Sequence, residues 1–77
     1  MTAREMFEEL GYNIVYENND YLEYVRIDPF VYRSLIKFDY GRQIVFKRNS
    51  NLLPLGVTSE EHKAIHQQLK ELGWLDE

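Results

Sequence analysis

The chain has 77 residues, a formal net charge of −4, 44% hydrophobic residues and no cysteine. Its length predicts one domain spanning residues 1–77, and its hydrophobic content excludes a disordered chain. The lack of cysteine excludes a disulfide framework and a thiolate zinc site. The charged N-terminus and the short apolar clusters predict neither a signal peptide nor a membrane span, so we expect a cytoplasmic protein without a membrane partner.

The first predicted element is a helix over residues 3–10. Thr2 and Glu5 form the T-x-x-E pattern, in which two side chains bind the free backbone amides at a helix start. Gly11 follows the helix and suits the left-handed conformation that closes a last turn, which would bring Phe7 against Tyr12. Because two helical turns are unstable alone in water, we expect packing to hold this helix in place.

The next segment, YNIVYENNDYLEYVRI, alternates apolar and polar residues around the turn signal ENND. This pattern predicts two antiparallel strands. A three-residue loop over residues 18–20 would pair Ile14 with Tyr24 and Tyr16 with Leu22, and would keep one face of the hairpin apolar. A two-residue loop would place an isoleucine opposite a glutamate, so we expect the three-residue loop.

A second hairpin is predicted for VYRSLIKFDYGRQIVFKR, which the segment DPF separates from the first. We expect a three-residue loop over residues 39–41, with Gly41 in the left-handed conformation and Ile36 paired with Ile44. The apolar face of this hairpin would then consist of Ile36, Phe38, Ile44 and Phe46. On the opposite face, the same register pairs Arg33 with Lys47, Leu35 with Val45, and Lys37 with Gln43.

The second hairpin is also the basic part of the chain. Residues 31–50 hold five basic residues and one acidic residue, whereas the segments before and after them are acidic. An apolar strip with cations at its rim suits the binding of a nucleic acid or of an acidic protein surface. The candidate binding residues are Arg33, Lys37, Tyr40, Arg42 and Lys47. The alternative is that these bases pair with nearby acidic side chains and that a helix covers the strip.

A second helix is predicted over residues 59–72, after the connection NSNLLPLGV. Thr58 and Glu61 repeat the T-x-x-E pattern, and Gly73 with Trp74 repeats the glycine and aromatic residue that follow the first helix. The sequence therefore predicts an α+β fold. It has a short N-terminal helix, an antiparallel β-meander of three to four strands, and a C-terminal helix packed on the sheet.

Catalytic and metal-binding patterns are weak in this chain. His62 and His66 lie four residues apart on the second helix, a spacing that can place two imidazoles on one metal. However, Lys63 follows His62 where zinc proteases have a glutamate, and no third ligand is evident. The serines lack a nucleophile motif, and the four glycines form no phosphate-binding loop. We therefore expect no enzyme, no metal and no cofactor.

Four segments carry a resemblance to a known group, namely TAREMFEELGY, ENNDYLEY, IKFDYGRQIVFKR and TSEEHKAIHQQLKELGWL. In this order they resemble short uncharacterised proteins encoded by bacteriophages and prophages of Gram-positive bacteria. That group has F-E-x-L-G-Y near the start and A-I-x-x-Q-x-x-E-L-G-W near the end, and VRIDPFVYRSL is the segment that matches its pattern least. The resemblance implies a helix–sheet–helix unit and a phage-derived gene that acts in the host cytoplasm, and it implies no catalytic or binding residues.

These features predict a non-enzymatic module that binds a macromolecule. An unknown host or phage protein is the expected partner. The alternative is a nucleic-acid-binding accessory protein that uses the basic hairpin of residues 31–48, although such proteins usually have a basic domain overall. Salt dependence separates the two, because neutralisation of phosphates makes affinity fall steeply as salt rises.

Overall fold

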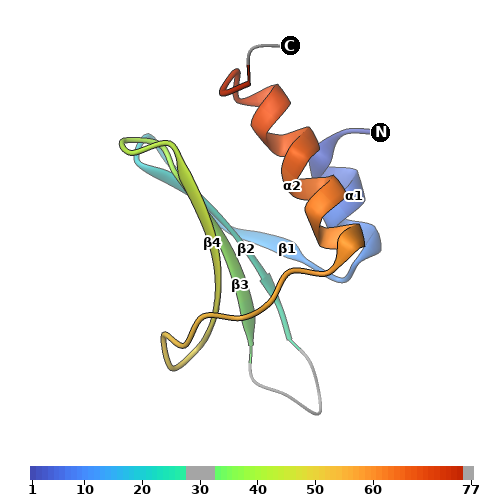
Figure 1. Cartoon of the computed structure of the whole chain (residues 1–77), viewed down its shortest axis with the longest axis vertical. Coiled ribbons are helices and arrows are strands. Elements are labelled where there is room, and N and C mark those ends of the chain that lie inside the picture. Colours follow the sequence, from blue (N-terminus) through green and yellow to red (C-terminus); the bar gives the residue numbers. More distant parts are fainter. Residues whose placement is uncertain (28–32, 76–77) are drawn as a thin grey trace.

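The computed structural model describes residues 1–27 and 33–75. The elements in chain order are α1 (Ala3–Glu9), β1 (Asn13–Glu17), β2 (Tyr21–Arg26), β3 (Ser34–Asp39), β4 (Ile44–Asn49) and α2 (Ser59–Glu71). The strands form one antiparallel sheet in the order β1-β2-β3-β4, and the two helices lie side by side on one face of it (Figure 1). The predicted α+β architecture is confirmed, with four strands in the meander. Within the described residues, no helix has the length and apolar character needed to cross a membrane.

Both helices begin with the capping box that the sequence predicts. At α1, the Glu5 amide donates to Thr2 Oγ1 at 3.2 Å, and the Thr2 amide donates to Glu5 Oε1 at 2.8 Å. At α2, Thr58 and Glu61 exchange the same two hydrogen bonds at 3.1 and 2.9 Å. These reciprocal bonds satisfy amides that a helix start leaves free, so each T-x-x-E pattern sets the residue at which its helix begins.

Both helices also end at the predicted glycines. Gly11 and Gly73 have left-handed φ angles of +90° and +74°. The aromatic residue after each glycine donates its amide to the carbonyl oxygen five residues earlier, at 2.9 Å to Phe7 and at 3.0 Å to Leu69. This closure is the Schellman motif, and the ring of Tyr12 meets the ring of Phe7 edge-on with centroids 5.8 Å apart.

Replacement of Gly73 by alanine should lower the free energy of unfolding by about 1 kcal/mol, because a Cβ makes the left-handed conformation unfavourable. A Cβ at this position would meet no atom within 4 Å, so the cost arises from the backbone alone. Urea unfolding measures the change. Gly56→Ala is the matched control, since its Cβ also meets nothing within 4 Å and its φ is not left-handed. An unchanged midpoint for Gly73→Ala would contradict the assigned cap.

The core lies between the helices and one face of the sheet. Tyr24 on β2 and Ile36 and Phe38 on β3 are buried there against Phe7 of α1. The Phe7 ring stacks on the Tyr24 ring with centroids 4.0 Å apart, so packing holds the two turns of α1 as expected. The Tyr24 hydroxyl keeps a polar partner inside the core, because it donates to Gln68 Oε1 of α2 at 2.7 Å.

The first hairpin follows the predicted register at its base but not near its turn. Ile14 pairs with Tyr24 as predicted, whereas Tyr16 pairs with Glu23 and not with Leu22. The difference arises from a β-bulge between residues 14 and 16, where β1 carries one extra residue.

The turn of the first hairpin contains residues 18–20, as predicted. Asn18 Oδ1 accepts hydrogen bonds from the amides of Asp20 and Tyr21 at 2.8 and 3.0 Å. The Asn18 amide in turn donates to the Tyr21 carbonyl oxygen at 3.1 Å. Asparagine commonly stabilises turns in this way.

The second hairpin has a register three residues away from the predicted one. Ile36 pairs with Lys47 and not with Ile44. The predicted pairs are therefore wrong, namely Arg33 with Lys47, Leu35 with Val45, and Lys37 with Gln43. An odd shift turns every side chain of β4 over, so Ile44 and Phe46 lie on the face opposite Ile36 and Phe38.

The loop of the second hairpin explains the register. It contains residues 40–43, and its left-handed residue is Gln43, with φ of +53°, instead of the predicted Gly41. The Asp39 carboxylate closes the loop by accepting hydrogen bonds from the Arg42 amide at 3.3 Å and from the Arg42 guanidinium at 2.8 and 3.1 Å. These bonds hold the pKa of Asp39 below its usual value and favour the four-residue loop.

Candidate functional site

The face of the sheet opposite the helices, called here the open face, is not covered by a helix in the described part of the chain. It consists of Tyr21, Glu23 and Val25 of β2, Leu35, Lys37 and Asp39 of β3, and Ile44, Phe46 and Arg48 of β4. The register of β4 places Ile44 and Phe46 on this face, where they are 40% and 36% exposed. Tyr16 extends the face onto β1, opposite Glu23. Exposed apolar side chains that gather in this way are typical of interaction surfaces.

Two cations lie among these apolar side chains. The Lys37 ammonium is 4.1 Å from the centroid of the Tyr21 ring and forms no ion pair within residues 1–27 and 33–75. The Arg48 guanidinium forms a loose ion pair with Glu23, with 3.9 Å between Nη2 and Oε2. The open face therefore combines apolar area with one cation that has no carboxylate partner in the described residues.

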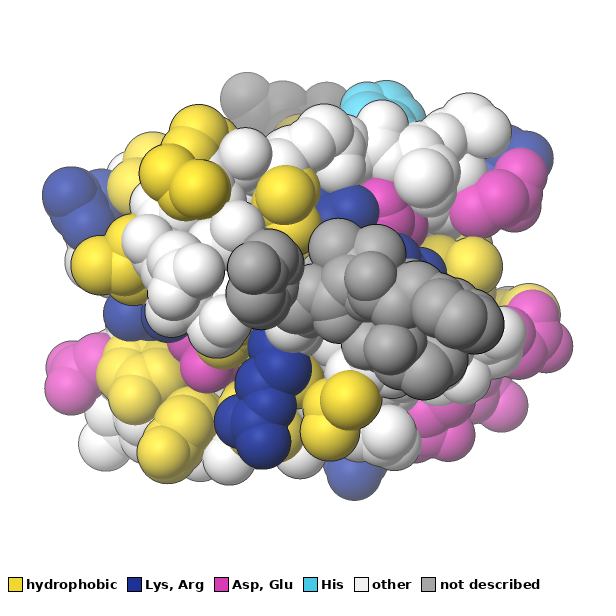
Figure 2. All heavy atoms as spheres, turned by 90° about the horizontal axis from the view of Figure 1, so that it is seen from below, with side chains coloured by type: hydrophobic (Ala, Val, Ile, Leu, Met, Phe, Trp, Pro, Cys, Tyr) yellow, Lys and Arg dark blue, Asp and Glu magenta, His cyan; other side chains and the backbone are white. Residues whose placement is uncertain are grey.

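A groove of 410 Å³ lies where the open face meets the connection between β4 and α2. Its walls include Lys37 and Phe46 from the sheet and Leu52 and Pro54 from the connection. Figure 2 shows hydrophobic side chains grouped toward the left, where this connection runs in Figure 1, with basic side chains between them. The volume is within the range of ligand-binding pockets, so the groove is large enough to receive side chains of a partner.

The five candidate residues do not gather on one surface. Lys37 lies on the open face, and Arg33 is exposed just before β3. Arg42 lies in the loop of the second hairpin and pairs with Asp39, with 2.8 Å between Nη2 and Oδ2. The charge of Arg42 is therefore largely neutralised within its own loop.

Tyr40 and Lys47 lie on the helix side of the sheet. The Tyr40 ring meets the Trp74 ring edge-on with centroids 6.3 Å apart, and it lines a smaller groove of 220 Å³ between the sheet and the helices. Lys47 pairs across the strands with Ile36, a core residue, so its side chain points inward. The expected placement of Tyr40 and Lys47 beside Lys37 is thus wrong, because the shifted register of β4 turns Lys47 over.

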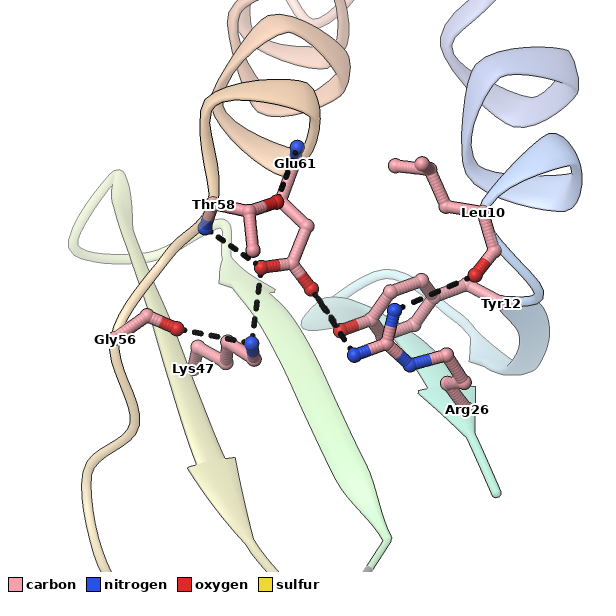
Figure 3. Close-up of polar contacts among 7 residues, drawn as sticks. All are labelled: Leu10, Tyr12, Arg26, Lys47, Gly56, Thr58 and Glu61. Atoms are coloured by element: carbon pink, nitrogen blue, oxygen red, sulfur yellow. Dashed lines mark hydrogen bonds and ion pairs between the residues drawn. The ribbon is translucent and has the colours of Figure 1, made fainter. Parts of the chain in front are cut away.

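Lys47 enters a buried ionic cluster centred on Glu61, the third residue of α2 (Figure 3). Its ammonium is 2.9 Å from Glu61 Oε1 and donates a second hydrogen bond to the Gly56 carbonyl oxygen at 2.9 Å. The side chains of Lys47 and Glu61 are 8% and 1% exposed. Lys47 is therefore closed to an external anion.

Three more groups converge on Glu61 (Figure 3). The Tyr12 hydroxyl donates to Oε2, and the Thr58 amide donates to Oε1 at 2.9 Å. Arg26 Nη2 lies 3.7 Å from Oε2, and its guanidinium covers the Tyr12 ring at 4.8 Å from the centroid. Arg26 also donates to the Leu10 carbonyl oxygen at 3.4 Å, so the cluster connects α2 with β4, β2 and the end of α1.

The cluster keeps Glu61 ionised. Burial raises the pKa of Glu61, but the hydrogen bonds from Thr58, Tyr12 and Lys47 and the charge of Lys47 outweigh it, so the pKa is lowered overall. Burial, reinforced by Glu61, raises the pKa of the Tyr12 hydroxyl, which stays protonated. Because Glu61 is 0% exposed, it presents no group to a substrate, and we assign the cluster a structural role.

Acidification should remove the stabilisation that Glu61 contributes. Its pKa in the folded protein is lowered from the ordinary value of a glutamate, so the stabilisation is fully present only well above that ordinary value and is lost as the pH falls through the folded-state pKa. We expect the difference in unfolding free energy between the wild type and Glu61→Gln to narrow in acid. Urea unfolding at several pH values measures this difference. Asp39 and Glu5 also have lowered pKa values, but both proteins contain them, so their contributions to the pH dependence of stability cancel in the difference. A difference that widened in acid would contradict this role.

Sequence reasoning missed the apolar residues of the site. It assigned Ile44 and Phe46 to the core because it used the wrong register for β4. It also treated Leu52 as part of a plain connection, although two consecutive leucines in the turn-rich segment NSNLLP are a signal of exposed apolar side chains.

Comparisons with known proteins complete the description of the site. No protein-family model, no curated protein and no solved structure matches the chain. The resemblance to phage and prophage proteins therefore stays a prediction. Within the part of the chain that the structure describes, no three His, Cys, Asp or Glu side chains form a group that could hold a metal ion.

Proposed function

We propose that the protein is a non-enzymatic module that binds another protein through the open face of its sheet. The exposure of Ile44 and Phe46, which are neighbours on the same face of β4, carries this proposal. A sheet covered by helices on one face usually places its apolar side chains on that face and polar ones on the other. The register of β4 places Ile44 and Phe46 on the uncovered face, and a partner that covered these side chains would remove their apolar area from water.

The ion pairs of the basic segment favour a protein over a nucleic acid. Most of its cations have acidic partners inside the protein, namely Lys47 with Glu61, Arg42 with Asp39, and Arg48 with Glu23. Binding to a nucleic acid depends on several free cations that neutralise phosphates. Arg33 and Lys37 alone would supply little of that charge, so the alternative function for residues 31–48 has weaker support.

The remaining parts of the proposal follow from the cluster and from the resemblance. The closed position of Glu61 supports a function without catalysis, because the carboxylate has no exposed surface. As the resemblance to phage and prophage proteins implies, the partner would be a phage or host protein in the bacterial cytoplasm.

Retention of a partner from a lysate of the bacterial host tests the proposal. The proteins compared are the wild type, Phe46→Ser and the control Val57→Ser, which removes an apolar side chain of 46% exposure outside the open face. We expect Phe46→Ser to lose the partner and Val57→Ser to keep it. Nuclease and added salt should change retention little. Urea unfolding of each variant verifies that the fold is intact.

Two outcomes would contradict the proposal. Retention that nuclease abolishes, and that falls steeply with salt, would assign residues 31–48 to nucleic-acid binding. Equal retention by the wild type and Phe46→Ser would show that the open face is not the binding surface.

A further inference from the structure

We propose that the groove beside Leu52 receives a segment of the partner protein that combines an apolar side chain with a carboxylate. This inference rests on the proposed function, because it names what the binding surface recognises. Two independent observations support it. One is the backbone conformation and exposure of Leu52, and the other is the charge of the groove.

Residues 50–52 form a short loop that Asn49 holds in place. Asn49 is 6% exposed, and its Oδ1 accepts hydrogen bonds from the amides of Asn51 and Leu53 at 2.8 and 3.0 Å. The Asn49 amide donates to the Leu53 carbonyl oxygen at 2.9 Å, and its own carbonyl oxygen accepts from the Leu52 amide at 3.1 Å. Four hydrogen bonds to one buried residue therefore determine where Leu52 lies.

Leu52 is an unfavourable residue for this loop if stability alone is considered. Its φ is +66°, a left-handed conformation that glycine or asparagine adopts with less strain than leucine. It is also 72% exposed, so its side chain gains little from burial. Residues that conflict with both local backbone preference and burial are expected at functional sites, where another interaction compensates.

The groove combines apolar walls with positive charge. Phe46, Leu52 and Pro54 supply the apolar walls, and Lys37 stands at the sheet side of the groove. Within residues 1–27 and 33–75, Lys37 contacts the Tyr21 ring but forms no ion pair. A carboxylate beside an apolar side chain would therefore satisfy both the charge and the apolar area of the groove.

The same features decide between possible occupants. Arg48 and Lys47 also line the groove, but the 3.9 Å contact of Arg48 with Glu23 and the 2.9 Å contact of Lys47 with Glu61 already offset their charges. With only Lys37 free of an ion pair in the described residues, the groove matches one or two carboxylates better than the repeated phosphates of a nucleic acid. The groove therefore favours a protein segment that is both acidic and apolar over a nucleic acid.

Selection from a displayed library of random peptides tests this inference. Peptides selected by the wild type should combine Leu, Ile or Phe with Asp or Glu. Lys37→Glu places an anion where the groove has its cation without an ion pair, and it should select peptides that carry Lys or Arg. Lys70→Glu makes the same change on an exposed residue of α2 and is the matched control, so it should select the same peptides as the wild type.

The variant Leu52→Asn tests whether Leu52 contributes to peptide binding or to the stability of the fold. Asparagine tolerates the left-handed conformation better than leucine, so the urea midpoint should equal or exceed that of the wild type. The peptides selected by the wild type should nevertheless bind this variant about ten-fold more weakly, as expected for loss of a central apolar contact. A structural role for Leu52 would instead lower the midpoint.

Several results would overturn the inference. They are the absence of selected peptides, selected peptides without acidic residues, the same selection by Lys37→Glu as by the wild type, and equal peptide binding by Leu52→Asn.

A lysate partner that is lost on Phe46→Ser but kept by Lys37→Glu and Leu52→Asn would overturn the inference and leave the proposed function standing. A partner kept by Phe46→Ser, a second copy of this chain as the sole partner, or nuclease-sensitive retention would overturn both.

Discussion

Replacement of Lys47 by alanine should lower the free energy of unfolding by about 3 kcal/mol, because it leaves a buried carboxylate without its nearest cation. Lys47 Nζ and Glu61 Oε1 are 2.9 Å apart, and the two side chains are 8% and 1% exposed. Arg26 remains 3.7 Å from the other carboxylate oxygen, which limits the loss. Urea unfolding at neutral pH measures the change.

Arg33→Ala is the matched control for this prediction. It removes a basic side chain from the same segment of the sequence, but Arg33 is exposed and forms no ion pair within the described residues. Its free energy of unfolding should change by about 0.5 kcal/mol or less. If the two variants unfolded at the same urea concentration, Lys47 would not lie inside the protein.

Replacement of Phe7 by alanine should lower the free energy of unfolding by about 3–5 kcal/mol, the usual cost of removing a buried aromatic ring. Phe7 is 0% exposed, and its ring stacks on Tyr24 at 4.0 Å and meets Phe38 edge-on at 6.2 Å. A loss of this size approaches the whole stability expected for a small domain. We therefore expect much of the variant to be unfolded at 25 °C, as far-ultraviolet circular dichroism would show.

Two further variants keep this prediction measurable. Phe7→Leu retains most of the apolar volume and should lose less stability than Phe7→Ala, so its urea transition can still be followed. Glu9→Ala changes an exposed residue of the same helix and should leave stability close to that of the wild type. Equal stability of Phe7→Ala and Glu9→Ala would show that packing of Phe7 does not hold α1.

The helix boundaries could be predicted from the sequence because their signals are local. Each capping box connects residues three positions apart, and each closing glycine acts within the last turn of its own helix. The resulting hydrogen bonds form with little dependence on the rest of the protein. The repeated ELG followed by an aromatic residue is thus explained by two helix ends of the same kind.

The register of β4 could not be predicted in this way, because it depends on distant contacts. Apolar residues occur on both faces of β4, so alternation alone does not distinguish the two registers. The observed register turns Lys47 inward to Glu61, which is 14 residues further along the chain. That placement satisfies a buried carboxylate and leaves Phe46 on the open face.

The candidate site was predictable only where it did not depend on this register. The sequence placed Lys37 on the side of β3 opposite the core, and the structure agrees. The groove could not be predicted, since it forms between Phe46 on β4 and Leu52 in a loop held by Asn49. The strain at Leu52 is a property of the folded backbone and has no counterpart in the residue pattern.

The most direct measurement of the central claim is site-specific photo-cross-linking in a lysate of the bacterial host. A photoreactive phenylalanine analogue replaces Phe46 on the open face in one protein, and replaces Glu9 on the exposed side of α1 in another. If the open face binds a protein, the analogue at position 46 should form a nuclease-resistant protein adduct and the analogue at position 9 should not. An adduct at position 9 alone, or none at position 46, would contradict the account.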